Sequence, residues 1–282
     1  MKLTFLGTAA ATAMPLPFCR CATCAKARSL GGKDTRKRSS LVINEDLLID
    51  LGPDCAAAGM EYHLDLSKIG FLLQTHAHSD HFDAGHFITR HPDYATKGLT
   101  PLVPVASQET MTAMNRRLQG EDGGADLFDS GFQRKLNLSL QLVSHGQQIQ
   151  LGGYTIRALE SLHDIGEQSL IYLITREGKS ILYATDLLQI SEDVYRLLEG
   201  RHIDLLILDH TYGEGCNAGG HPDAGQVKSI LKSFRRRRLI DDRSQVLATH
   251  VSHEGNDTHE EMRGVAIQSG YDVAYDGLIV TI

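Results

Sequence analysis

Four side chains of the kind that bind metals fall within six consecutive residues of this chain. They are His76, His78, Asp80 and His81 in the run His-Ala-His-Ser-Asp-His, which follows the apolar segment Gly70–Gln74. The run constrains the fold, because in a loop after a strand alternate residues can point into one cavity and His81 can turn to its other side. Imidazole and carboxylate groups together suit zinc, manganese or iron. We therefore expect a metal site on a strand-end loop.

Three further residues of the same kind stand at the ends of other apolar runs. They are His163, Asp186 and His250, which follow Thr155–Leu159, Ser180–Thr185 and Gln245–Thr249. A carboxylate or imidazole has little packing reason to lie there, although a lone histidine among the chain's 14 is more often a surface or core residue. With the dense run, these residues supply the two histidines and the carboxylate that a second metal needs. The set predicts a two-metal site.

A second cluster consists of three of the chain's five cysteines, Cys19, Cys21 and Cys24. Tightly spaced thiolates with a fourth ligand elsewhere hold tetrahedral structural zinc, and such usage suits a reducing compartment better than disulfides do. The candidates for the fourth ligand are Cys55, Cys216 and a histidine. We favour His253, because a turn after His250 could send the two histidines to different centres. The alternative is that the cysteines are unpaired small apolar residues.

Apolar periodicity predicts alternating strands and helices, and therefore two packed sheets with helices outside them. The expected strands are Lys2–Leu6, Ser40–Ile43, Leu47–Asp50, Gly70–Gln74, Leu102–Ala106, Thr155–Leu159, Ser169–Thr175, Ser180–Thr185, Leu205–Asp209, Gln245–Thr249, Val273–Ala274 and Leu278–Ile282. The expected helices are Asp83–Thr89, Gln108–Leu118, Glu192–Leu198, Ala224–Phe234 and Thr258–Gln268. Without repeats or linkers, we expect residues 1–282 to form a single domain, with an N-terminal cysteine-rich zinc segment at about 19–24.

Composition limits the class of protein, the cellular compartment and the kinds of partner that we expect. Hydrophobic residues make up 41% and the net charge is −7, which indicates a globular protein and disfavours nucleic acid as a partner. The start, Met1–Gly7, does not resemble a signal peptide, and no apolar run approaches the roughly 18 residues of a membrane helix. We expect a cytoplasmic protein without membrane contact. A homodimer is possible.

The run His-x-His-x-Asp-His resembles the signature of the metallo-β-lactamase superfamily, and Asp50, His163, Asp186 and His250 follow that superfamily's order. The resemblance implies an α/β fold, the αββα four-layer sandwich, with metals at one edge. It implies that one metal is held by His76, His78 and His163, and the other by Asp80, His81 and His250, with Asp186 bridging them. Asp50 would orient a ligand histidine; the alternative is a carboxylate that only shapes a strand-end turn.

The cysteine segment, together with His253, resembles the PhnP phosphodiesterase family. That resemblance implies Cys19, Cys21, Cys24 and His253 as ligands of a structural zinc. The pyrroloquinoline quinone biosynthesis protein of the same superfamily has a similar segment, so the cysteines alone do not decide the function.

We expect a metal-dependent hydrolase, a phosphodiesterase acting on a small cyclic or diester phosphate through a hydroxide that bridges two divalent ions, Zn or Mn. Asp80 and His221 are the expected catalytic residues. His221 lies between a Gly-rich loop and a helix start, where the resemblance places an acid or phosphate-binding histidine; the alternative is a loop histidine without a special role. Lys33 and Arg36–Arg38 could meet a second phosphate, although a flexible basic surface loop explains them more simply.

Three other functions stay open. The first is a nuclease of the tRNA 3′-processing type, which the negative charge and the lack of a Lys- and Gly-rich inserted arm disfavour. The second is a thioester or lactone hydrolase, which the metal ligands do not exclude. The third is a non-hydrolytic cofactor-biosynthesis protein of the pyrroloquinoline quinone type. Asp209 and His210, after another strand, are either supporting groups or packing residues.

Overall fold

The computed structural model describes residues 1–94, 97–163, 168–216 and 219–282. In this part of the chain the strands form two sheets of seven. The first contains, in spatial order, β14 (Ile279–Thr281), β1 (Lys2–Gly7), β2 (Ser40–Ile43), β3 (Leu47–Ile49), β4 (Phe71–Leu73), β5 (Val103–Ala106) and β6 (Gln141–Leu142). The second contains β13 (Asp272–Val273), β12 (Gln245–Thr249), β11 (Leu205–Asp209), β10 (Lys179–Ala184), β9 (Leu170–Arg176), β8 (Tyr154–Glu160) and β7 (Gln148–Leu151).

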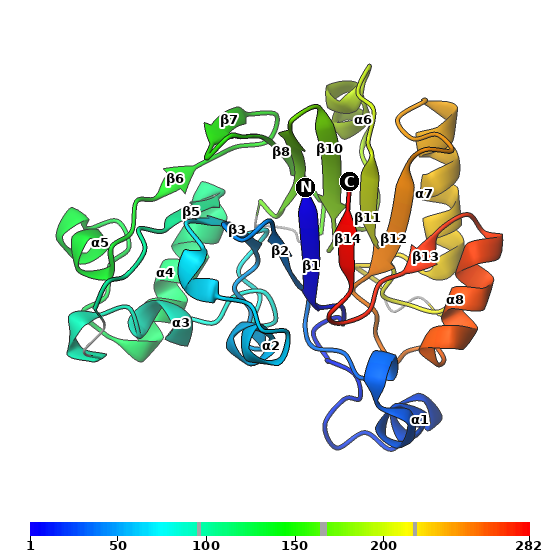
Figure 1. Ribbon diagram of the computed structural model, residues 1–282, viewed down its shortest axis with the longest axis horizontal. Coiled ribbons are helices and arrows are strands. Elements are labelled where there is room, and N and C mark those ends of the chain that lie inside the picture. The colour runs from blue at the N-terminus through cyan, green and yellow to red at the C-terminus, as the bar shows by residue number, and fades with distance from the viewer. Residues whose placement is uncertain (95–96, 164–167, 217–218) are drawn as a thin grey trace.

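Helices cover the outer face of each sheet (Figure 1). The first sheet carries α2 (Cys55–Glu61), α3 (Gly85–Ile88), α4 (Gln108–Glu121) and α5 (Ser130–Leu136), and the second carries α6 (Glu192–Leu198), α7 (Ala224–Arg236) and α8 (His259–Gln268). A further helix, α1 (Ala22–Leu30), projects beyond the strand ends (Figure 1). The layers therefore run helix, sheet, sheet, helix, and the predicted αββα sandwich is confirmed.

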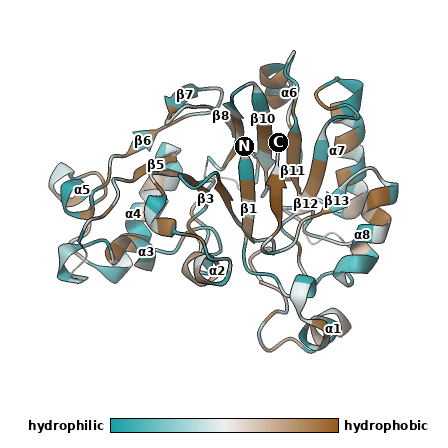
Figure 2. Ribbon diagram, in the orientation of Figure 1, coloured by the Kyte–Doolittle hydropathy of each residue, from teal (hydrophilic) through white to brown (hydrophobic). Residues whose placement is uncertain are grey.

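Apolar residues on both faces of the strands build the layers. Along β10, Ile181 and Tyr183 face the other sheet, whereas Leu182 and Ala184 face the helices. A strand buried on both faces reads as a continuous apolar run, and Figure 2 shows the central strands largely brown. Helix α7 instead buries one stripe, and Asp223 and Gln226 form a capping box at its start.

The parallel strands β10, β11 and β12 end at one edge of the second sheet. Ala184 pairs with Leu208, and Asp209 pairs with Thr249. In the first sheet β3 and β4 are also parallel and end together. The backbone N–H of Leu170 donates to the carbonyl of Thr75 at 2.9 Å, which joins the two edges. The loops that follow these strands therefore meet.

The predicted elements are found with shifted ends, and several others were missed. The helix expected at Asp83–Thr89 is only the four-residue α3, and that at Gln108–Leu118 extends to Glu121. Three helices, α1, α2 and α5, and two edge strands, β6 and β7, were not expected. No helix among the described residues is long and apolar enough to cross a membrane. The single-domain organisation stays a prediction.

Candidate metal centres

The loops after the strands bring the expected ligands into two groups. The ligand atoms of Asp80, His81, Asp186 and His250, all four buried, lie within 4.8 Å of one another. The same holds for those of His76, His78 and His163. Residues that are up to 174 positions apart in the chain (76 and 250) thus share one strand-end site.

Asp186 lies between the groups. Its Oδ1 is 3.2 Å from Nε2 of His250, 3.7 Å from Nε2 of His163 and 3.9 Å from Nε2 of His76, while its Oδ2 is 3.2 Å from Nε2 of His81. A single carboxylate therefore faces imidazoles of both groups, which is the position that a bridging ligand needs.

The inward-facing atoms of this site have unsatisfied hydrogen-bonding capacity. Nε2 of His76, His81 and His250 and Oδ2 of Asp186 are buried without a hydrogen bond to any residue that the structure describes. An unsatisfied buried polar atom costs about 1–3 kcal/mol, so a native chain leaves four together only where something else binds them. Imidazole nitrogens and carboxylate oxygens are ligands for divalent transition metals. The residues present therefore fit two divalent cations.

The outward-facing ring nitrogens are each held in place. Nδ1 of His81 lies 2.7 Å from Oδ2 of Asp50, Nδ1 of His76 lies 2.9 Å from Oγ1 of Thr75, and Nδ1 of His250 lies 2.8 Å from Oγ1 of Thr211. Partners of this kind orient a metal-binding imidazole and present its Nε2 inward. Gln74 fixes the backbone of the loop that carries His76 and His81, because its Nε2 donates to the carbonyls of both residues.

Several backbone positions at the site are strained. Asp50, Leu162, Asp186 and His250 have φ between 53° and 61°. Non-glycine residues in this left-handed region cost of order 1–3 kcal/mol each and persist only where the surroundings impose them. Asp50 and His250 directly follow strand ends, Leu162 precedes the proposed ligand His163, and Asp186 is itself a proposed ligand, so the strained positions lie at the site.

Burial and neighbouring charges set the protonation states. Burial opposes the ionisation of Asp186, but His250 and His81 lower its pKa well below the usual value. Burial also disfavours charge on His81, yet Asp186 and Asp80 raise its pKa well above the usual value. Burial keeps the pKa of His76 well below its usual value, so this imidazole is neutral, as a ligand must be.

His221 lies beside the groups, and Asp209 holds it. Nδ1 of His221 is 2.9 Å from Oδ2 of Asp209, and its ring stacks on that of His250 with centroids 5.0 Å apart. Burial opposes protonation of His221, but the hydrogen bond and charge of Asp209 raise its pKa to about 9. A ligand atom of His221 also lies within 4.8 Å of those of His163 and Asp186. The loop histidine therefore has specific partners in the site.

The sequence left the role of Asp209 undecided between a supporting group and a packing residue. This fully buried carboxylate accepts hydrogen bonds from the backbone N–H of Asp186 (2.8 Å) and from the hydroxyl of Thr211 (2.6 Å), in addition to its contact with His221. It therefore positions groups on three loops. Asp209 ends an apolar strand just as Asp186 follows one, so the same signal could have found it.

The cysteine segment and His253 meet at a second site, below the strand ends. Sγ of Cys21 and Cys19 lie 3.4 and 3.9 Å from Nδ1 of His253, and with Cys24 the four ligand atoms are within 4.8 Å of one another. The backbone N–H of Cys24 donates to Cys21 and lowers the pKa of that thiol to about 6, which favours the thiolate. Three thiols and one imidazole fit a tetrahedral zinc.

The other candidates for the fourth ligand lie elsewhere. Cys55 is the first residue of α2 and is buried in the core, and Cys216 packs against Gly255. Neither belongs to the thiol group among the described residues.

The basic stretch is not a free surface loop, contrary to expectation. Arg36 is 3% exposed and donates to the hydroxyl of Thr8 and the carbonyl of Ala274. The other three cations form ion pairs with carboxylates: Lys33 with Glu260, Lys37 with Glu61, and Arg38 with Asp54. The basic side chains therefore bind groups on other segments of the chain, and their charges are not free for a substrate.

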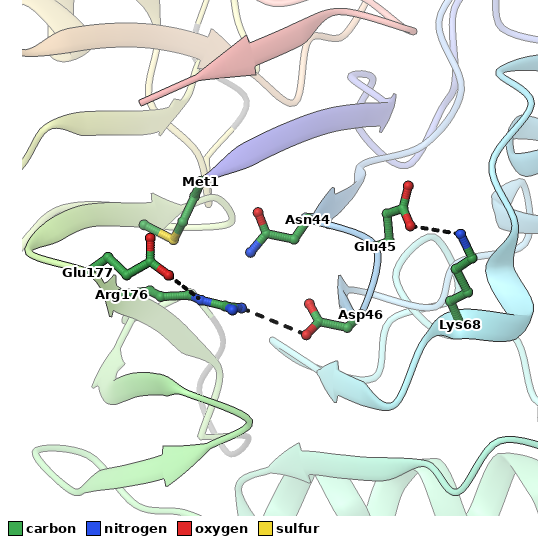
Figure 3. A pocket seen from close by; sticks show the side chains of 7 residues that line it. All are labelled: Met1, Asn44, Glu45, Asp46, Lys68, Arg176 and Glu177. Carbon is green, nitrogen blue, oxygen red and sulfur yellow. Dashed lines mark hydrogen bonds and ion pairs between the residues drawn. The ribbon is translucent and has the colours of Figure 1, made fainter.

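A hollow of about 460 Å³ lies near the start of β1, the end opposite the metal groups (Figure 3). Its charged side chains pair with one another: Arg176 with Asp46 and Glu177, and Lys68 with Glu45. All five charged side chains take part in these pairs, and the lining that the structure describes includes none of the proposed metal ligands, so this hollow is not a competing site for the two ions.

Comparison with known proteins places the chain among metal-dependent hydrolases. A family model described as the β-lactamase superfamily domain matches residues 45–241. No curated protein matches the sequence. Among solved structures, a diphosphatase from the PhnP family is similar (TM-score 0.71, 23% identity, 99% of this chain and 96% of that one).

Two further structures align over their full lengths. Zn²⁺-bound PqqB from Methylobacterium extorquens has a TM-score of 0.73 and 18% identity, with 100% of both chains covered. The short form of human tRNase Z has a TM-score of 0.65 and 18% identity, with 100% of this chain and 99% of that one covered. At these identities the likeness establishes the fold and leaves the substrate open.

Proposed function

Because the chain belongs to the β-lactamase superfamily, whose members include metal-dependent hydrolases, we propose that it is a phosphodiesterase acting on a small cyclic or diester phosphate. The observation that carries the proposal is His221, an imidazole paired with buried Asp209 and lying beside both metal groups. The thiolate that leaves a thioester has less need of such a donor than an alkoxide, which departs from phosphorus as a strong base.

The proposed ligands of the two ions are the residues of the two strand-end groups: His76, His78 and His163 for one, Asp80, His81 and His250 for the other, and Asp186 for both. Two divalent metals, when bound, lower the pKa of a water toward neutrality and neutralise charge on phosphate oxygens. The chain's own part is to hold these ligands rigidly, through Asp50, Thr75 and Thr211, so that little reorganisation accompanies the reaction.

His221 supplies the proton in this proposal. Asp209 occupies its Nδ1, so the proton to be transferred is at Nε2. The hydrogen bond and charge of Asp209 raise the pKa of this imidazole, which favours the protonated form that can donate to a departing alkoxide. General acid catalysis of this kind contributes about 10²–10⁴-fold.

A panel of substrates tests the class. Purified protein with Mn or Zn is assayed on bis-p-nitrophenyl phosphate, a 2′,3′-cyclic nucleotide, a precursor tRNA and a thioester. We expect turnover of the first two. Cleavage of the precursor tRNA alone would indicate a nuclease, and activity on the thioester alone would overturn the proposal.

His221→Ala tests the proton donor. We expect turnover of an alkyl phosphodiester, with its strongly basic leaving group, to fall by about 10²–10⁴-fold, and that of bis-p-nitrophenyl phosphate to fall far less, because nitrophenolate leaves without a proton. His202→Ala, a histidine outside both groups, serves as the control. Equal losses on both esters, or loss of metal measured by mass spectrometry, would assign His221 a structural or ligand role instead.

A further inference from the structure

A separate pocket of about 370 Å³ lies between the start of α7, the helix α8 and two turns, near Gly213 and Gly255. None of its lining residues is a proposed metal ligand. Its volume falls in the range of small-molecule sites, and the proposed hydrolase activity makes no use of it.

One wall of the pocket is apolar. Met262 and Tyr271 are buried there, and Val265 on α8 stands 51% exposed at its edge. Such a wall accepts an aliphatic or aromatic group, for which burial is favourable by roughly 25 cal/mol per Å² of apolar surface.

Another part of the lining is acidic. It includes Glu214, Asp257 and Glu261, and among the described residues it contains no lysine or arginine. Lys228 pairs with Glu214 at 2.8 Å, and Lys26 lies 2.5 Å from Asp257 and 3.6 Å from Glu261. Three carboxylates against two lysines leave one negative charge uncompensated at this wall, which favours a cationic ligand.

A buried imidazole contributes to the lining. His210 is 3% exposed, its Nε2 has no hydrogen-bond partner in the described part of the chain, and its Nδ1 lies 3.5 Å from the hydroxyl of Tyr271. Since unpartnered buried polar atoms are rare in native proteins, His210 independently points to a ligand. Burial lowers the pKa of this imidazole to about 4, so it is neutral at pH 7 and does not repel a cation.

We propose that this pocket binds a small organic cation that carries an apolar group, with its ammonium facing Glu214, Asp257 and Glu261 and its apolar part against Met262 and Val265. The occupant is an amine of about the size of one aromatic ring with a short chain. The position of His210 between Asp209 and Thr211, which hold the strand-end site, places the pocket one residue away from the metal-orienting contacts.

Phenethylamine is a suitable probe, with 3-phenylpropionate as an anion of similar shape. The protein, loaded with metal, is labelled at its methionine methyl groups, and each probe is titrated while the methyl signal of Met262 is followed by NMR. We expect saturable movement of that signal with the amine and none with the acid. No movement with the amine, or equal movement with both probes, would overturn the proposal.

Two substitutions on α8 form a matched pair. Val265 and Ile267 are both 51% exposed, and only Val265 lines the pocket. Val265→Trp should fill the pocket and abolish binding of the amine, whereas Ile267→Trp should bind it as the wild type does. Glu214→Gln should raise the Kd about 2–5-fold, the effect of one exposed charge pair. Retained binding in Val265→Trp would place the amine elsewhere and contradict the proposal.

Discussion

At the residue scale, the site depends on atoms that never face a metal. Asp50 is fully buried and accepts from the backbone N–H and hydroxyl of Thr75 as well as facing Nδ1 of His81. Burial raises its pKa, although the charge of His81 opposes the shift. Asp50 therefore fixes both the tautomer of one imidazole and the start of the loop that carries the others.

Asp50→Asn should weaken metal binding. Loss of an orienting carboxylate typically lowers metal affinity about 10–100-fold, and we expect this for the ion next to His81, with little change in the thiol site. Competition with a chelator of known affinity measures it. Asp242→Asn, at an exposed turn carboxylate, is the control; identical affinities in the two variants would show that Asp50 only shapes its turn.

Ligand positions could be predicted from the sequence, and the strand-end position of Asp209 could be noticed there too, whereas the contacts that the supporting residues make could not be predicted. Histidine and aspartate at the ends of apolar runs stand out locally, as His76, Asp186 and His250 do. The roles of Asp209 and Thr211 depend on contacts with loops 23 and 39 residues away (209 to 186 and 211 to 250). No local pattern reports such contacts.

At the element scale, two of the three missed helices, α1 and α2, have unusual start signals. Helix α1 begins after Cys21, whose Sγ accepts from the N–H of Cys24, an end-capping role that serine or aspartate usually fills. Helix α2 begins after Asp54, whose carboxylate pairs with Arg38 instead of capping the helix. Long periodic helices such as α4 and α7 were predicted, since their apolar stripes are longer.

A buried polar network joins elements from both ends of the chain. Beside Arg36, Asp276 accepts from the hydroxyl of Thr8 (2.7 Å) and the backbone N–H of Lys37 (2.6 Å). Burial raises the pKa of Asp276 to about 6, and burial lowers that of His259, which faces Arg36, to about 4. The two groups therefore affect stability in opposite directions between pH 4 and 6.5.

Asp276→Asn should remove the contribution of Asp276 to the pH dependence of stability and leave that of His259 in place. The folded state holds the Asp276 proton more tightly than the unfolded chain does, so its stabilisation is complete below about pH 4 and is lost as the pH rises through about 6. From pH 4 to 7 the wild type should lose about 2–3 kcal/mol of unfolding free energy relative to Asp276→Asn. Urea unfolding at each pH measures it; His259 acts equally in both proteins. Parallel pH profiles would contradict the raised pKa.

At the scale of the whole molecule, the sandwich places both metal groups and the thiol site at one end of the sheets. The turn after β12 connects them, because it carries both His250 and His253, and the N–H of Val251 within it donates to the carbonyl of Thr8. The αββα order could be predicted from alternating apolar runs and from the family resemblance. The way in which the edges of the two sheets meet at the site could not be predicted, because it depends on long-range register.

Metal content tests the central claim, that two strand-end groups bind two ions and the thiol group a third. Mass spectrometry of the purified protein should find about three metal ions per chain, of which one, bound by Cys19, Cys21, Cys24 and His253, resists a chelator. Asp186→Ala should lower the chelator-sensitive content, and Cys21→Ser should remove the resistant ion. A single ion per chain in fully active wild-type protein would contradict the two-metal site.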